Sequence, residues 1–283
     1  AIIPLWYNIS MKTSPRVKEA IAVATKAHEG QLRKTGEPYI IHPLAVMKIL
    51  VEWNMDEDTV IAGVLHDTVE DTDLSLKEIE DRFYKELEFG TGGLRGVIGA
   101  GTNRMNIYTV RKASQGLANY IIKANGQKKG IAIAYDSRFM SPEFADEAAL
   151  CMAANGIKAY VFDALRPTPE LSFAIRKLGC ISGIVVTASH NPPEYNGYKV
   201  YWEDGAQITA PKDKEIIAEV NAITDYYTVK TMDKEAAISA GLYHIIGAEI
   251  DEAYMAELKK QIIHAEVIKE SCKDLKIVYS KHL

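Results

Sequence analysis

Apolar positions through residues 15–83 recur every three or four residues, the spacing of amphipathic helices. The first predicted helix has its apolar face at Val17, Ala20, Ile21, Ala24 and Ala27. A second helix is predicted from Pro43, a residue favoured at the first helical position, and a third with Asp58 or Thr59 near its start. No strand pattern interrupts these helices, so the stretch is predicted to be all-α.

From about residue 105 the pattern changes to short β-branched runs that alternate with helices. Strands are predicted over 130–135, 157–162, 181–186 and 197–202, with a last one over 275–280. Helices are predicted over 109–124, after Ser141-Pro142, after Pro169, from Pro211, and over 249–270. This alternation indicates an α/β layered domain. The expected fold is therefore an α/β layered domain preceded by an all-α helical segment.

Charge and composition narrow the function before any motif is considered. The 283 residues carry a net charge of −5, which provides no basic surface for nucleic acid or for an anionic membrane. There is no run of about 18 apolar residues, so no membrane span is expected. The three cysteines are few and widely spaced, which favours reduced thiols and a cytoplasmic protein.

The helical half contains one group of metal-ligand residues. His42 is predicted to precede a helix, and His66-Asp67 to end the next one. Imidazole and carboxylate together suit a divalent cation such as Mn²⁺, Fe²⁺ or Zn²⁺. If the helix continues, Glu70 and Asp71 lie one turn further along the same face, where they could activate a water beside the metal. The alternative is an acidic helix end with two incidental histidines.

The residues around this group favour the metal site. The runs "AHEGQLRKTGEPYIIHPLAV" and "VIAGVLHDTVEDTDLSLKEIEDRF" resemble the HD-type hydrolase domain of the Rel/Spo alarmone family over residues 15–83. The resemblance implies that His42, His66 and Asp67 are Mn²⁺ ligands and that Glu70 and Asp71 form the hydrolytic acidic pair. It also implies that Arg33 and Lys34 contact the substrate, guanosine tetraphosphate.

The second half contains a candidate phosphoserine. Ser189 follows a predicted strand, His190 is next to it, and Lys199 lies on the returning strand. No nearby acid–histidine arrangement suggests an acyl-transfer triad, and the run is not a G-x-S-x-G elbow. A serine that is phosphorylated and flanked by cations fits better. Upstream, a Gly-rich run with Arg95 is a weak phosphate-loop signal, because it has neither the Walker nor the dinucleotide spacing.

Several motifs in this half resemble the first domain of the α-D-phosphohexomutases, the phosphoglucomutases and phosphomannomutases. They are "FGTGGLRG", "GTNRMNIYTVRKASQGLANY", "AYDSR" and "TASHNPPEYNGYKVY". The resemblance implies that Ser189 carries a phosphoryl group between the sugar 1- and 6-positions and that Mg²⁺ bridges the phosphoserine. Lys199 and His190 would then move protons or stabilise charge, and Arg95 would contact the phosphate. Arg138 would bind the sugar phosphate, with a capping or ion-pair role as the alternative.

The two resemblances meet within residues 74–84, in a helix that suits both patterns. The expected organisation is an HD-type segment over 1–83, a mutase first domain over 84–270, and the start of a second mutase domain over 271–283. By the resemblance, the family's metal-binding and sugar-binding loops would lie in further domains. We therefore expect a mutase fragment that is inactive as written. An HD-type alarmone hydrolase fragment and a non-catalytic chimera are the alternatives.

Overall fold

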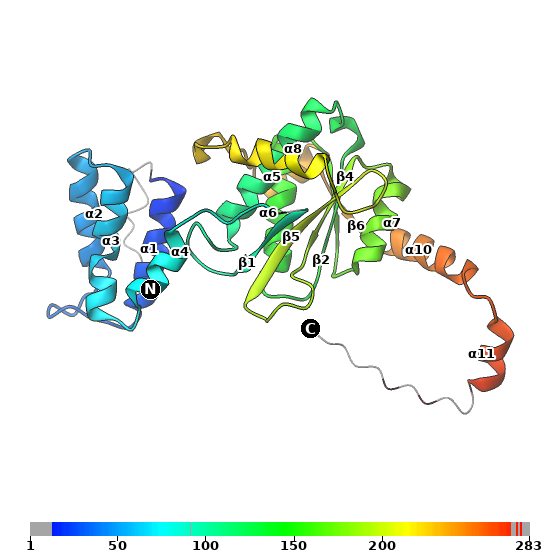
Figure 1. Ribbon diagram of the computed structural model, residues 1–283, viewed down its shortest axis with the longest axis horizontal. Coiled ribbons are helices and arrows are strands. Elements are labelled where there is room, and N and C mark those ends of the chain that lie inside the picture. The colour runs from blue at the N-terminus through cyan, green and yellow to red at the C-terminus, as the bar shows by residue number, and fades with distance from the viewer. Residues whose placement is uncertain (1–12, 91, 273–275, 277, 279–283) are drawn as a thin grey trace.

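The computed structural model describes residues 13–90, 92–272, 276 and 278. Figure 1 shows a group of helices at one end of the molecule and a sheet covered by helices beside it. The strand predicted over 275–280 falls almost wholly outside the described residues. Within the described part, no helix has both the length and the apolar character that crossing a membrane would require.

Four helices form the N-terminal segment, as the periodicity predicts. They are α1 (Pro15–Ala27), α2 (Ile41–Glu52), α3 (Glu57–Asp71) and α4 (Leu76–Phe83). The apolar faces of the first three bury a shared core that includes Ala20, Leu44 and Val64. This segment is all-α, as expected.

Two predicted boundaries in this segment were wrong by a few residues. Helix α2 begins at Ile41, so Pro43 is its third residue and His42 lies inside the helix rather than before it. Helix α3 continues to Asp71, so His66-Asp67 does not end it, although its start beside Asp58 agrees with the prediction. The difference at α2 reflects the tolerance of a first helical turn, where backbone N–H groups have no partner within the helix.

The second part is an α/β domain with a mixed sheet. Its strands are β1 (Gly93–Val97), β2 (Ile131–Tyr135), β3 (Ala159–Phe162), β4 (Ser182–Val186), β5 (Tyr195–Trp202) and β6 (Tyr243–Ile246). Its helices are α5 (Ile107–Lys123), α6 (Ser141–Ala154), α7 (Thr168–Leu178), α8 (Lys212–Asn221), α9 (Lys234–Ser239), α10 (Ala248–Lys260) and α11 (Ala265–Ser271). Two short 3₁₀ turns cover Gln127–Lys129 and Tyr226–Thr228.

The strands are ordered β1-β5-β4-β2-β3-β6. Strands β4, β2, β3 and β6 are parallel, while β5 is antiparallel to β4 and β1 is antiparallel to β5. One face of the sheet packs on α5, α6 and α8 through residues such as Ile133 and Tyr198. The other face packs on α7 and α10 through residues such as Ala134 and Val185. The parallel strands therefore end at one edge of a sheet buried on both faces.

Strands β1 and β6 and helix α9 were not predicted, and the helix predicted over 249–270 is divided into α10 and α11. Strand β1 was missed because its glycines resemble a loop. A side chain at Gly93 (φ 151°) would place its Cβ 1.8 Å from the Tyr198 carbonyl oxygen of β5. The Gly-rich run therefore permits close strand pairing over residues 93–97.

Gly99 and Gly101 of this run lie against the helical segment. A Cβ at Gly101 would lie 2.6 Å from the Arg82 carbonyl oxygen of α4. Arg82 Nη1 donates to the Ala100 carbonyl at 3.0 Å, and Arg104 Nη2 donates to Asp81 Oδ2 at 2.5 Å. Ala100 also packs against the helical core. Helix α4 and residues 98–104 thus join the two halves.

Candidate functional site

The Ser189 loop follows the last residue of β4 at the edge where the parallel strands end. The loop begins beside β5, because Thr187 N donates to the Gly197 carbonyl at 3.0 Å. Ser189 is exposed and has a φ of 61°, a left-handed conformation that residues with a Cβ rarely adopt. Its backbone N–H donates to Thr187 Oγ1 at 3.0 Å. The hydroxyl is therefore presented to solvent by a backbone that the loop constrains.

Two cations lie on one face of the sheet next to the base of this loop. Lys199 of β5 is opposite Gly93, and Arg95 of β1 is opposite Gly197, so both side chains point to the same face. Arg95 Nη1 also reaches Asn191 Oδ1 in the loop, at 3.2 Å. Desolvation, and then the charge of Arg95, lower the pKa of Lys199. The pair forms a positive surface beside the loop.

The two remaining predicted residues of this half take different positions. His190 is exposed, and its Nδ1 lies 3.3 Å from Ser189 Oγ, a long hydrogen bond at most. Arg138 lies after β2 and points under the loop, where its guanidinium donates to loop carbonyls, including that of Ser189 at 2.9 Å. The structure thus brings Ser189, His190 and Arg138 together, with Arg95 and Lys199 at the side.

The three predicted metal ligands of the helical segment converge. One ligand atom each of His42, His66 and Asp67 lies within 4.8 Å of the others. His66 Nδ1 is 2.8 Å from the Gly63 carbonyl, so Nδ1 carries the proton and Nε2 presents its lone pair. Nε2 is 2.9 Å from Asp67 Oδ1, and two acceptors this close need a cation or a proton between them. This donor set fits a divalent metal with open coordination positions.

Tyr39 connects this group to the predicted acidic pair, and it was not singled out from the sequence. Its hydroxyl lies 3.1 Å from Asp67 Oδ2 and 2.7 Å from Asp71 Oδ2. The hydrogen bond to Asp71 is the largest of the effects that raise the pKa of Tyr39. Helix α3 continues to Asp71, so Glu70 and Asp71 do extend one turn beyond the His-Asp pair. Tyr39 lies before α2 and its partners lie on α3, so no local spacing in the sequence indicates this contact.

Arg33 and Lys34 occupy a small exposed turn that leads into this site. The turn is closed by Arg33 N, which donates to the Glu37 carbonyl at 2.8 Å. At its base, Gln31 Nε2 donates to the Asp71 carbonyl at 2.8 Å. Among the described contacts, neither cationic side chain bonds to His42, His66 or Asp67. Gln31, two residues before Arg33, thus links this turn to the C-terminal end of α3.

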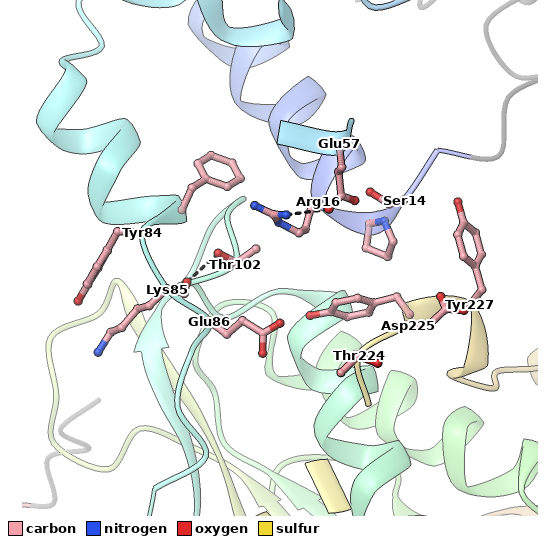
Figure 2. Close-up of a pocket in the computed structure, with 13 residues that line it drawn as sticks. Ser14, Arg16, Glu57, Tyr84, Lys85, Glu86, Thr102, Thr224, Asp225 and Tyr227 are labelled. Carbon is pink, nitrogen blue, oxygen red and sulfur yellow. Dashed lines mark hydrogen bonds and ion pairs between the residues drawn. The ribbon is translucent and has the colours of Figure 1, made fainter. Parts of the chain in front are cut away.

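A cavity of about 560 Å³ lies between the two halves, and the sequence did not predict it. Figure 2 shows Arg16 and Glu57 from the helical segment facing Glu86 and Asp225 across it. Arg16 Nη1 donates to Glu57 at 2.7 Å, and Glu86 accepts from Lys112 at 2.5 Å. The residues that line this cavity include none of the predicted site residues. It is a consequence of the way the halves meet.

Two family models match the chain. The model described as phosphoglucomutase/phosphomannomutase, alpha/beta/alpha domain I, matches residues 86–227. The HD-domain model matches residues 20–88. The two matches overlap just after α4, close to the predicted junction.

Curated relatives match the second half. A phosphoglucomutase of Staphylococcus saprophyticus is 39% identical over 176 residues, which are 62% of this chain and 32% of that protein. A phosphopentomutase of Homo sapiens is 37% identical over 203 residues, which are 69% of this chain and 33% of that protein. The chain thus spans about a third of the length of the curated relatives that it matches.

Solved structures agree with the fold. A protein of Thermus thermophilus, described as a candidate phosphomannomutase, is 29% identical with a TM-score of 0.53, over 63% of this chain and 36% of that chain. The pp63/parafusin phosphoglucomutase of Paramecium is 20% identical with a TM-score of 0.52, over 68% of this chain and 37% of that chain, a likeness of fold alone. Since the first family model matches half of the chain and includes the Ser189 loop with the strands beside it, the chain belongs to the phosphoglucomutase/phosphomannomutase family.

Proposed function

We propose that the α/β domain is the phosphoserine domain of a sugar-phosphate mutase. The observation that carries the proposal is the exposed, conformationally constrained Ser189 in a loop that Arg95 contacts through Asn191, with Lys199 on the same sheet face as Arg95. Ser189 Oγ would accept a phosphoryl group from a sugar bisphosphate and pass it to the 1- or 6-hydroxyl of a sugar monophosphate. The relatives are named for glucose and pentose phosphates, so the substrate class is sugar phosphates.

The chain's own residues would supply positioning and charge. When phosphoserine forms, the P–O bond to the sugar breaks, the Oγ–P bond forms, and the proton of Oγ is transferred to the departing sugar oxygen. Lys199 and His190 are the groups we assign to this proton or to the charge, and Arg95 is assigned to the phosphoryl oxygens. Electrostatic stabilisation of this kind accounts for most of the catalysis in phosphoryl transfer.

Mg²⁺ would neutralise part of the charge of the phosphoserine. Around Ser189, the charged side chains described above are mainly cations, and Asp136 accepts hydrogen bonds from Arg138 N at 3.0 Å and Ser141 Oγ at 2.8 Å. Within the described residues, we therefore assign only the phosphoserine itself to Mg²⁺.

The test of this proposal is the partial reaction on Ser189. The phosphatase-treated chain is incubated with glucose 1,6-bisphosphate and Mg²⁺, and its intact mass is measured. We expect a gain of one phosphoryl group, located on Ser189 by peptide mapping and lost in Ser189→Ala. Ser137→Ala, an exposed serine in a neighbouring loop, is the matched control and should behave as wild type. Absence of any mass gain in the wild-type chain would contradict the proposal.

We further propose that the helical segment is a metal-dependent phosphohydrolase site of the Rel/Spo type, as a second function. Convergence of His42, His66 and Asp67 favours it. Bound there, Mn²⁺ would activate a water, and Glu70 and Asp71 would orient it or take its proton. Arg33 and Lys34 would meet a guanosine tetraphosphate substrate at the entrance. The match of residues 20–88 to the HD-domain model supports the metal site. The alarmone substrate is proposed only from the sequence motifs around His42 and His66.

Mn²⁺ binding tests this second function directly. We expect calorimetry to detect one Mn²⁺ per chain and His66→Ala to weaken binding more than about 100-fold, since a ligand matters at least as much as its outer-shell partners. His244→Ala is the control, because His244 Nε2 bonds the Gly241 carbonyl at 2.9 Å in the other half. Equal Mn²⁺ affinity in wild type and His66→Ala would exclude the site. Release of pyrophosphate from guanosine tetraphosphate would then identify the substrate.

A further inference from the structure

One arginine holds most of the Ser189 loop. Arg138 Nη1 donates to the carbonyls of Pro192 at 2.9 Å and Tyr195 at 3.0 Å. Nη2 donates to those of Ser189 at 2.9 Å and Asn191 at 2.7 Å. The side chain is only 8% exposed. A guanidinium has four Nη hydrogens, and these four bonds use all of them.

On its other side, the guanidinium lies beside Asp136, which follows β2. Its Nε lies 3.5 Å from Asp136 Oδ2, while Asp136 Oδ1 accepts from Ser141 Oγ at 2.8 Å. Ser141 Oγ also accepts from Asn196 Nδ2 at 2.9 Å, and Asn196 is fully buried on β5. The start of α6, the turn after β2 and the returning strand therefore share one network beneath the loop.

This network has a direct consequence for the backbone of Ser189. A left-handed serine persists only where its surroundings determine it. Ser189 has such bonds on both sides, because its N–H donates to Thr187 and its carbonyl accepts from Arg138. The direction of the Ser189 side chain depends on that backbone conformation.

We propose that Arg138 is a positioning residue, which holds Ser189 in its left-handed conformation and thereby aims Oγ for phosphoryl transfer. The part about transfer rests on the proposed function. Arg138 does not bind the sugar phosphate, because the loop carbonyls already take its Nη hydrogens. This assignment replaces the substrate-binding role suggested by sequence and extends the ion-pair alternative.

Three variants test the proposal with two independent measurements. They are Arg138→Ala, Arg138→Lys and the control Arg176→Ala, an arginine whose Nη1 lies 3.4 Å from the Asp204 carbonyl away from the loop. Hydrogen exchange of the amides of Ser189 and Asn191 reports on the loop. The rate of Ser189 phosphorylation by glucose 1,6-bisphosphate with Mg²⁺ reports on the reactivity of the Ser189 hydroxyl.

For Arg138→Ala we expect loop exchange to rise about tenfold or more while exchange in β2 and β4 stays unchanged. Phosphorylation should slow by about 100-fold, the cost of misplacing a reacting group. Millimolar guanidinium should restore part of both values in Arg138→Ala but should leave Ser189→Ala unphosphorylated. Arg138→Lys should recover little, since an ammonium cannot reach four carbonyls. Arg176→Ala should match wild type.

The two measurements separate the possible failures. Unchanged loop exchange in Arg138→Ala overturns the proposal, and so does increased exchange with an unchanged phosphorylation rate. If slow phosphorylation occurs with an intact loop, Arg138 acts on the substrate instead, which also overturns it. If the wild-type chain takes up no phosphate, the proposed function fails. Loop exchange then decides by itself whether Arg138 holds the Ser189 conformation.

Discussion

At the scale of single residues, the α/β site is a serine held beside positive charge. Lys199 is paired with Gly93, and Arg95 lies two residues further along β1 on the same face of the sheet. The positive charge of Arg95 contributes to the lowered pKa of Lys199. Desolvation is the larger cause of this lowered pKa, because the Lys199 side chain is partly buried. A lysine in this position gives up its proton more readily than one in water, yet it still places a charge beside a phosphoryl group.

Removal of that charge should slow the chemistry of Ser189. We expect Lys199→Met to lower the rate of Ser189 phosphorylation by roughly 100-fold, comparable to the loss of one stabilising group at a developing charge. Lys199→Arg keeps the charge and should retain a larger rate. Lys129→Met is the control, because Lys129 pairs with Glu203 at the surface. A wild-type rate in Lys199→Met would show that Lys199 takes no part.

At the scale of elements, helix α1 meets the start of α5 through a buried carboxyl. Glu19 of α1 is only 3% exposed, and its Oε2 has no hydrogen-bond partner among the described atoms. Burial raises the pKa of Glu19 to about 8, against smaller opposing effects of Asn106, Arg16 and the Gly101 backbone. The contact between the two halves is therefore built around a carboxyl that is protonated at neutral pH.

This carboxyl should make stability depend on pH. The folded state holds the Glu19 proton up to about pH 8, whereas the unfolded chain releases it near the ordinary value of 4.5. Between those values the folded state binds more protons, so its stability falls as pH rises, by at most roughly 1.4 kcal/mol per pH unit. Glu19→Gln should remove this dependence and be more stable than wild type at pH 7.

Urea unfolding at pH 5, 6, 7 and 8 measures the effect. The difference in unfolding free energy between Glu19→Gln and wild type should grow with pH and level off above about pH 8, the pKa of Glu19. Glu29→Gln is the control, since Glu29 is exposed on the same segment. A difference that is constant over this range would contradict a buried, protonated Glu19.

At the scale of the whole molecule, the described residues form separate hydrophobic clusters in the two halves. Helix α4 and residues 98–104 connect them, through bonds such as Arg82 to Ala100 and Arg104 to Asp81. The junction predicted within residues 74–84 therefore falls on an element that packs on both sides. The cavity lined by Arg16, Glu57 and Glu86 lies at the same contact.

Much of this organisation follows from local pattern. The helices with a clear apolar face and the four strands with β-branched runs were predicted, because their periodicity arises from burial of one face or both. Strand β1 could not be predicted, because Gly93 and Gly96 are typical of a loop. Only the pairing of this segment with β5 shows that it is a strand. Strand β6, at the sheet edge, is short and has an exposed Ile245, so its pattern is weak.

The sequence by itself determined which motifs each half carries and that the second half is α/β. It also identified Ser189, His42, His66 and Asp67 as candidate site residues. These depend on residue type and spacing, which a linear chain carries. Only the tertiary structure decided that Arg138 lies beneath the Ser189 loop, that Tyr39 bridges Asp67 and Asp71, and that Glu19 is buried between the halves. Such contacts join residues far apart in the chain, and packing alone determines which of them meet.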